Sequence, residues 1–256
     1  MAEVATDANL QACECGSKCE FCDPENQKEI VDYDGLSENT PTYIRHNFIR
    51  KVFTIVLCQI LFAFGLVLIC YNIKPVKNFF VRYPLFSYSV TLLYVISVVI
   101  IGCVPGLTRN PTVSAICILY FTPLVSIMLT GYCCAFSSKE IGIALGISAV
   151  LVAGLIAFSF QTKYDFTKWT VLLAFASLQF IMAVGICGLM RIRAKYIAFS
   201  ALGSVIFSIW IIVDVQMIIG GNHVLQFTVD EYMFASMSLF TDIITVFMDI
   251  LRLVHF

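Results

Sequence analysis

The sequence predicts an all-α membrane protein with seven transmembrane helices. Hydrophobic residues make up 59% of the 256 residues and charged residues only 13%, whereas soluble domains carry about 25% charged residues. The apolar residues also occur in runs close to the ~20 residues that a helix needs to cross a bilayer. A membrane β-barrel would instead show alternating segments of about ten residues. The lipid bilayer is therefore the expected environment of the chain.

Residues 1–44 are predicted to form a disordered, acidic, cysteine-rich tail, because they are polar and lack apolar periodicity. Cys19 and Cys22 are spaced as zinc ligands often are, but no second such pair and no histidine pair accompanies them. Free or acylated thiols are therefore the favoured interpretation, and zinc binding is the alternative. The candidate zinc ligands are Cys13, Cys15, Cys19 and Cys22.

Residues 45–256 are predicted to form a single seven-helix transmembrane domain. A basic amphipathic segment, residues 45–51, precedes the first span at the membrane surface. Short connections make sequence neighbours antiparallel, and proline or glycine residues mark several of them. Pro75 and Pro84, for example, are expected to bracket the first loop. The predicted spans are 52–73, 85–104, 112–136, 140–160, 169–190, 196–219 and 232–254.

Asp214 and Asp242 are the strongest site candidates, because each lies within a long apolar run. A charged side chain at the bilayer centre costs roughly 2.5–3.5 kcal/mol on insertion scales, so such residues face the protein interior or a wet cavity. The last two spans are antiparallel neighbours, which allows both carboxylates to lie in one layer. Such a pair would share a proton or hold a cation. The alternative is two separate, hydrogen-bonded carboxyl groups.

Asp249 and Arg109 are accessory candidates. Asp249 follows Asp242 by seven residues and so lies on nearly the same helix face. It either extends an acidic track or, as we favour, reaches the lipid headgroups or Arg252. Arg109 lies in the second connection, where it either stays at the headgroups or swings inward to pair with the acidic residues.

Other functional classes have little support in the sequence. A net charge of −1 gives no electrostatic basis for nucleic-acid binding. An intramembrane aspartyl protease also needs two buried aspartates, but its Tyr-Asp and Gly-x-Gly-Asp contexts differ from Val213-Asp214 and Thr241-Asp242. No phosphate-binding loop or nucleophile elbow occurs, so neither an enzyme nor a cofactor is expected. The histidines, which have no partner at metal or triad spacing, are His46, His223 and His255.

Several segments carry recognisable motifs: residues 44–53 and 158–167, Val213-Asp214-Val215-Gln216, Asp230-Glu231-Tyr232, and Leu239-Phe240-Thr241-Asp242-Ile243-Ile244. These segments resemble the Bax-inhibitor-motif family, in particular its lifeguard branch. They follow one another in the family's order and spacing over about residues 41–254. Two departures are Val213, where the family usually has an aromatic residue, and Asp249, where it is normally apolar.

The resemblance implies seven helices with the last one central, a cytosolic N-terminus, and a pH-sensing latch formed by Asp214 and Asp242 that Arg109 can join. It implies a calcium leak channel of the endoplasmic reticulum or Golgi, or alternatively of the plasma membrane, that modulates calcium stores and suppresses apoptosis. Calcium, the transported ion, would bind the two aspartates weakly and transiently. The alternative function is a non-transporting interaction protein that regulates cell-death signalling by binding Bcl-type proteins or death receptors.

Overall fold

The computed structural model describes residue 36 and residues 40–103, 111–189, 196–221 and 223–255. The chain divides into two units, Met1–Asp34 and Gly35–Phe256, and every described residue lies in the second. The second unit therefore begins earlier than the boundary predicted at residue 45. Residues 42–44, expected in the disordered tail, are helical. The tail up to residue 35 lies outside the described residues. The predicted disorder of this tail and the candidate zinc ligands Cys13, Cys15, Cys19 and Cys22 therefore stay predictions.

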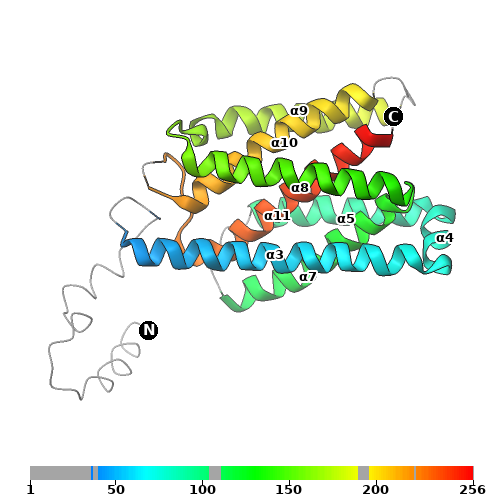
Figure 1. Cartoon of the computed structure of the whole chain (residues 1–256), viewed down its shortest axis with the longest axis horizontal. Coiled ribbons are helices and arrows are strands. Elements are labelled where there is room, and N and C mark those ends of the chain that lie inside the picture. Colours follow the sequence, from blue (N-terminus) through cyan, green and yellow to red (C-terminus); the bar gives the residue numbers. More distant parts are fainter. Residues whose placement is uncertain (1–35, 37–39, 104–110, 190–195, 222, 256) are drawn as a thin grey trace, which may run out of the picture. The chain divides into compact units, whose positions relative to one another are not determined.

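The described residues form helices and no β-strand, which confirms the predicted all-α class. Within the described ranges, five helices are long and apolar enough to cross a membrane, or six if the bent pair α4 and α5 counts as one span. Short 3-10 helices, η1 (Phe166–Trp169) and η3 (Val229–Glu231), precede α9 and α11. The helices are α3 (Thr42–Asn72), α4 (Lys74–Arg82), α5 (Pro84–Cys103), α7 (Pro111–Cys133), α8 (Ser138–Gln161), α9 (Thr170–Leu189), α10 (Tyr196–Ile219) and α11 (Tyr232–His255) (Figure 1).

The connection between the first two predicted spans is helical rather than an open loop, contrary to the sequence prediction. Pro75 lies in the first turn of α4, and Pro84 is the first residue of α5. Proline is tolerated there because the first amides of a helix have no intrahelical hydrogen-bond partner. The axes of α4 and α5 differ in direction by 81°, so these prolines mark helix starts within one bent pair.

Local sequence signals fix several helix ends. Ser137 and Glu140 form a capping box at the start of α8: the Glu140 carboxylate accepts from the Ser137 amide at 2.7 Å, and Ser137 Oγ accepts from the Glu140 amide at 3.4 Å. The end of α10 is followed by Gly220 and Gly221, whose φ angles of 66° and 101° lie in the left-handed region. Only glycine adopts this region without steric cost, so α10 ends as the sequence predicted.

Helix α11 is the most buried of the candidate spans. In its apolar window 72% of the residues are buried, against 17–50% in the other candidate spans. It contacts α3, α7, α8 and α10, and Figure 1 shows it running among them. Residues on α10 and α11 are therefore held at fixed positions by packing on several sides.

The two termini of the helical unit lie at opposite ends of the bundle. Near the start of α3, Lys51 Nζ lies 3.2 Å from the ring centroid of Tyr232, the first residue of α11. Near the end of α3, the Tyr71 hydroxyl donates to the Phe136 carbonyl at 3.2 Å, and the Phe136 ring packs 5.1 Å from that of His255 at the end of α11. Helices α3 and α11 thus run in the same direction.

Candidate functional site

The structure brings Asp214 and Asp242 together between α10 and α11. Asp214 is 1% exposed and Asp242 is 8% exposed. Their carboxylates are near enough for Asp214 to act on Asp242 by charge repulsion. The two helices pack along each other, and this contact places residues from two antiparallel segments side by side.

Asp214 has no hydrogen-bond donor at either carboxylate oxygen among the described residues. Ser238, one turn before Asp242 on α11, is the hydroxyl that faces Asp214, but it does not reach hydrogen-bond geometry. Most buried polar side-chain atoms in proteins do have a partner. The alternative of two separate, hydrogen-bonded carboxyl groups therefore does not describe Asp214, and its oxygens retain full capacity to accept a proton or contact a cation.

Helix α5 contributes a further polar group to this layer. The Tyr94 hydroxyl lies beside the Thr241 side chain and interacts electrostatically with Asp242. Tyr94 was not predicted as a site residue, because a tyrosine in an apolar span is usually an ordinary packing residue. Its hydroxyl supplies a donor where the sequence reasoning expected only carboxylates.

Asp249 lies further along α11 and is 6% exposed. Its Oδ1 atom is 3.9 Å from Nη1 of Arg252, so the favoured contact with Arg252 is present. Arg252 is also held by α7 and α10, because its Nε donates to the Tyr132 hydroxyl at 3.0 Å and its Nη1 to Ser200 Oγ at 3.4 Å. The second oxygen of Asp249, Oδ2, has no hydrogen-bond partner among the described residues.

The other predicted site residues do not join this arrangement. Arg109 lies outside the described residues, as do the four tail cysteines proposed as zinc ligands. Within the part of the chain that the structure describes, no group of three or more His, Cys, Asp or Glu side chains is arranged to hold a metal ion. Asp214 and Asp242 could therefore supply two carboxylates to a passing cation, with the remaining ligands coming from water or backbone oxygens.

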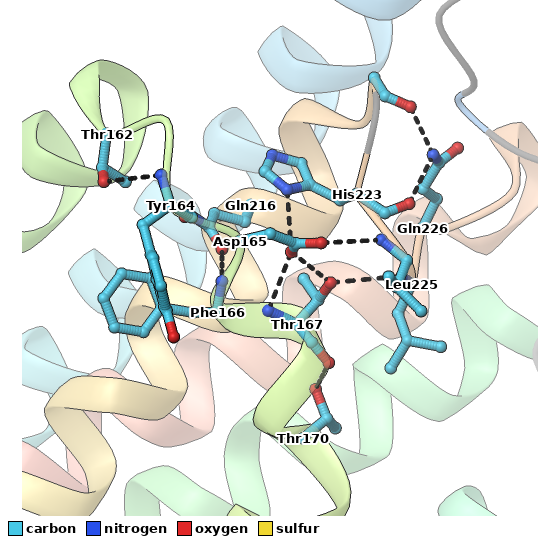
Figure 2. Close-up of polar contacts among 12 residues, drawn as sticks. Thr162, Tyr164, Asp165, Phe166, Thr167, Thr170, Gln216, His223, Leu225 and Gln226 are labelled. Atoms are coloured by element: carbon cyan, nitrogen blue, oxygen red, sulfur yellow. Dashed lines mark hydrogen bonds and ion pairs between the residues drawn. The ribbon is translucent and has the colours of Figure 1, made fainter.

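Gln216, two residues after Asp214, anchors the loop between α8 and α9. Its side chain is fully buried. Its Nε2 donates to the Tyr164 carbonyl at 2.7 Å, and its Oε1 accepts from the Phe166 amide at 2.9 Å. Both contacts lie in the cluster of loop residues drawn in Figure 2. The Asp-x-Gln segment thus combines a carboxylate that has no donor among the described residues with an amide that is hydrogen-bonded at both its nitrogen and its oxygen.

Asp165 is the centre of that loop cluster (Figure 2). Its carboxylate accepts from the Thr167 amide at 3.1 Å, Thr167 Oγ1 at 2.6 Å, His223 Nδ1 at 3.1 Å and the Val224 amide at 3.2 Å. Partial burial alone would raise the pKa of Asp165, but the hydrogen bonds from Thr167, His223 and Val224 outweigh it and lower the pKa. The cluster therefore joins the α8–α9 loop to the α10–α11 loop through a stable carboxylate.

The sequence reasoning missed this cluster, because it considered His223 only for partners at metal or triad spacing. His223 and Asp165 are 58 residues apart, so no local spacing signals their contact. His255 likewise contacts Glu140, with 3.0 Å between His255 Nδ1 and the carboxylate. The available signal was Asp165-x-Thr167, a pattern typical of side-chain capping at the start of a helical turn.

Comparison with known proteins agrees with the segments singled out above. The family described as "Inhibitor of apoptosis-promoting Bax1" matches residues 45–256. Protein lifeguard 3 of Homo sapiens is 27% identical over 232 residues, 89% of this chain and 74% of that protein. Its Mus musculus counterpart is 28% identical over 217 residues, 82% and 69%. Protein LIFEGUARD 1 of Arabidopsis thaliana is 24% identical over 234 residues, 87% and 93%. The chain therefore belongs to the Bax-inhibitor family and to its lifeguard branch.

Proposed function

We propose that the protein is a pH-sensitive calcium leak channel in which Asp214 and Asp242 line the ion path. The observation that carries the proposal is the state of Asp214: both oxygens are buried beside a second carboxylate, and no described residue donates to them. Intramembrane acidic residues of this kind commonly mark ion or proton paths, and calcium prefers oxygen ligands. No catalytic role is assigned to either residue.

In this proposal, protonation of the Asp214 and Asp242 carboxylates opens or closes the ion path. When both carboxylates are charged, they repel each other and attract a cation. When a proton is shared between them, the attraction weakens and the path closes. Arg109 could substitute for the proton by pairing with the acids, and Asp249 is the accessory acid toward the end of α11. Two carboxylates completed by water or carbonyl oxygens would give the weak, transient site that conduction requires.

Seven membrane crossings, with α11 central, are part of the proposal. Contacts between the starts of α3 and α11, and between their ends, favour an odd number of crossings, and the burial of α11 favours a central position. The N-terminus would be cytosolic and the C-terminus luminal or extracellular. Tags at the two termini should then differ in protease accessibility in selectively permeabilised cells, and equal accessibility would contradict an odd number.

The proposed cellular role is to modulate calcium stores and thereby suppress apoptosis, in the endoplasmic reticulum or Golgi. Support for the anti-apoptotic role comes from the family description, which names an inhibitor of an apoptosis-promoting protein. Bcl-type proteins or death receptors are candidate partners. The alternative is a non-transporting interaction protein, and the flux experiment distinguishes the two functions.

The test is calcium uptake by proteoliposomes across near-neutral pH. Wild type, Asp214→Asn, Asp242→Asn and the double variant are compared, with Asp230→Asn, an exposed acid outside the pair, as the matched control. Each single variant should flatten the pH dependence, and the double variant should add little, because coupled sites are non-additive. If the two single effects simply add, the carboxylates are independent; if well-folded wild type carries no calcium, the channel proposal fails.

A further inference from the structure

A large apolar cavity lies beside Asp242 and extends along α11 to Arg252. Its volume is about 860 Å³, within the range of roughly 300–1,000 Å³ that is common for small-molecule sites. Residues from α5, α7, α9, α10 and α11 line it. Most of the wall is hydrocarbon or aromatic, including Val95, Val99, Leu178, Phe180, Phe207 and Phe234. A cavity of this size and character is far larger than a passing ion requires and suits an alkyl chain.

Two carboxylates face this apolar space. Asp242 and Asp249 both line the cavity, and they are 8% and 6% exposed. Oδ2 of Asp249 has no hydrogen-bond partner among the described residues. A side-chain carbon added at Gly203 of α10 would lie only 2.5 Å from that oxygen and 2.8 Å from Phe180 Cζ. The missing side chain of Gly203 therefore makes the niche in which the Asp249 carboxylate sits.

The main donors around the cavity already have acceptors within the protein. Arg252 directs its Nε to the Tyr132 hydroxyl and its Nη1 to Ser200 and Asp249. The Trp210 indole donates to Ser177 Oγ at 2.8 Å. Among the described residues that line the cavity, the buried side-chain polar atom without a hydrogen-bond partner is Asp249 Oδ2. A ligand that complements this wall must therefore bring donors and positive charge.

We propose that the cavity binds a long-chain primary amine in its ammonium form. The alkyl chain lies along the apolar wall, and the ammonium group lies between Asp249 and Asp242. A charged donor and acceptor form a stronger hydrogen bond than neutral groups do, and low polarity strengthens the attraction further. A neutral lipid would leave Asp249 Oδ2 unpaired, and a fatty acid would add a third carboxylate to the two already present.

The binding itself does not depend on calcium transport. Only one consequence rests on the proposed function: an amine beside Asp242 would obstruct the calcium path. Binding is therefore measured directly, so that a failure of the amine site and a failure of the channel proposal give different results.

Trp210 provides a built-in reporter because it lines the cavity. The chain has 2 tryptophans, and the other, Trp169, is exposed at the end of η1. A Trp169→Phe protein in lipid nanodiscs leaves Trp210 as the sole indole. It is titrated with chain-brominated dodecylamine, whose bromine quenches indole fluorescence on contact. The matched ligands are the brominated alcohol and the brominated fatty acid of the same chain length.

We expect saturable quenching by the amine at concentrations at least about tenfold lower than for the alcohol, since a charge-assisted hydrogen bond is gained. On the same Trp169→Phe background, Asp249→Asn and Gly203→Ala should each remove most of this preference, while Asp230→Asn should retain it. Near-ultraviolet circular dichroism and a single elution peak confirm folding of each variant.

Equal quenching by amine and alcohol would overturn the proposal and leave an apolar cavity that accepts any chain. Stronger quenching by the fatty acid, lost in Arg252→Gln, would overturn it in favour of an anionic ligand. Both comparisons need only the Trp169→Phe protein and its arginine variant, so they remain decisive even if Gly203→Ala fails to fold.

Discussion

Asp165 and Asp214 are both largely buried carboxylates, yet their surroundings differ completely. The Asp165 side chain is 11% exposed and accepts hydrogen bonds from two backbone amides, a hydroxyl and an imidazole. Asp214 is 1% exposed and accepts none from the described residues. A hydrogen bond to a charged group contributes about 1.5–3 kcal/mol, and a buried unsatisfied group costs about 1–3 kcal/mol. Asp165 therefore stabilises the fold, whereas Asp214 is held by the fold at a cost.

This difference distinguishes an acid that stabilises the fold from acids that are available for the proposed function. A carboxylate that already has all its donors has little capacity for a ligand. A carboxylate without donors can take up a proton, a cation or an ammonium group when one arrives. Asp249 is intermediate, since one oxygen lies near Arg252 and the other has no hydrogen-bond partner in the described part of the chain.

The largest expected difference between the two acids is in calcium flux. Asp214→Asn should abolish most of the change in proteoliposome flux across near-neutral pH, which we expect to be on the order of tenfold in wild type for one titrating step. Asp165→Asn should retain the wild-type pH profile, because its carboxylate faces the loops. If Asp165→Asn flattened the profile as strongly, the distinction drawn here would fail.

For folding stability, we expect the larger effect from Asp165→Asn and the smaller effect from Asp214→Asn. Asp165→Asn should lower the free energy of unfolding by about 1–3 kcal/mol, because several donors lose a charged acceptor. Asp214→Asn should change it by less than about 1 kcal/mol, since no hydrogen bond is lost. Thermal unfolding in detergent measures both, and a larger loss for Asp214→Asn would show that its carboxyl group has a structural role.

The contribution of the Asp165 carboxylate to folding stability should decrease in acid. The pKa of Asp165 is lower in the folded protein than its ordinary value, so its contribution is fully present above the ordinary range of aspartate. It is lost as the pH falls through the lowered pKa. The stability difference between wild type and Asp165→Asn should therefore be constant near neutral pH and shrink in strong acid.

A smaller effect is expected at the glycine that closes α10. Gly220→Ala requires φ near 66° and places a side-chain carbon against the Leu36 carbonyl, so it should cost about 1–2 kcal/mol of stability from backbone conformation alone. Gly65→Ala is the matched control, because no atom lies within 4 Å of a side chain added there. It should be neutral or slightly stabilising, since alanine favours helix.

The smallest effect is expected from removing the tail. Deleting residues 1–34 should leave calcium flux within about twofold of wild type, because that segment forms a unit of its own. Deleting residues 1–38 also removes Leu36, which is buried. The Leu36 carbonyl accepts a hydrogen bond from the Gly221 amide, and the Leu36 amide donates to the Phe227 carbonyl. The longer deletion should therefore lower the unfolding temperature. Equal unfolding temperatures for the two deletion variants would show that Leu36 contributes nothing to stability.

The helical class, most of the helices and the two aspartates within apolar runs were predictable from the sequence alone. Helix α10 has the predicted bounds, and α11 begins at the predicted residue. The reason is physical: in lipid every backbone group must bond within its own segment, so an apolar run of sufficient length becomes a helix. For the same reason, an aspartate inside such a run is conspicuous without any structure.

Which polar groups contact one another depends on tertiary packing and was not predictable from the sequence. The groups that meet lie far apart in sequence or on different helices. Examples are Asp165 with His223, Gln216 with the loop after α8, and Gly203 with Asp249. Helix α4 also escaped prediction, because a proline can either end a helix or begin one. Packing fixes such pairs, and local spacing carries no information about them. The sequence could therefore name the acids, but only the fold shows that Asp165 accepts several hydrogen bonds whereas Asp214 accepts none from the residues described.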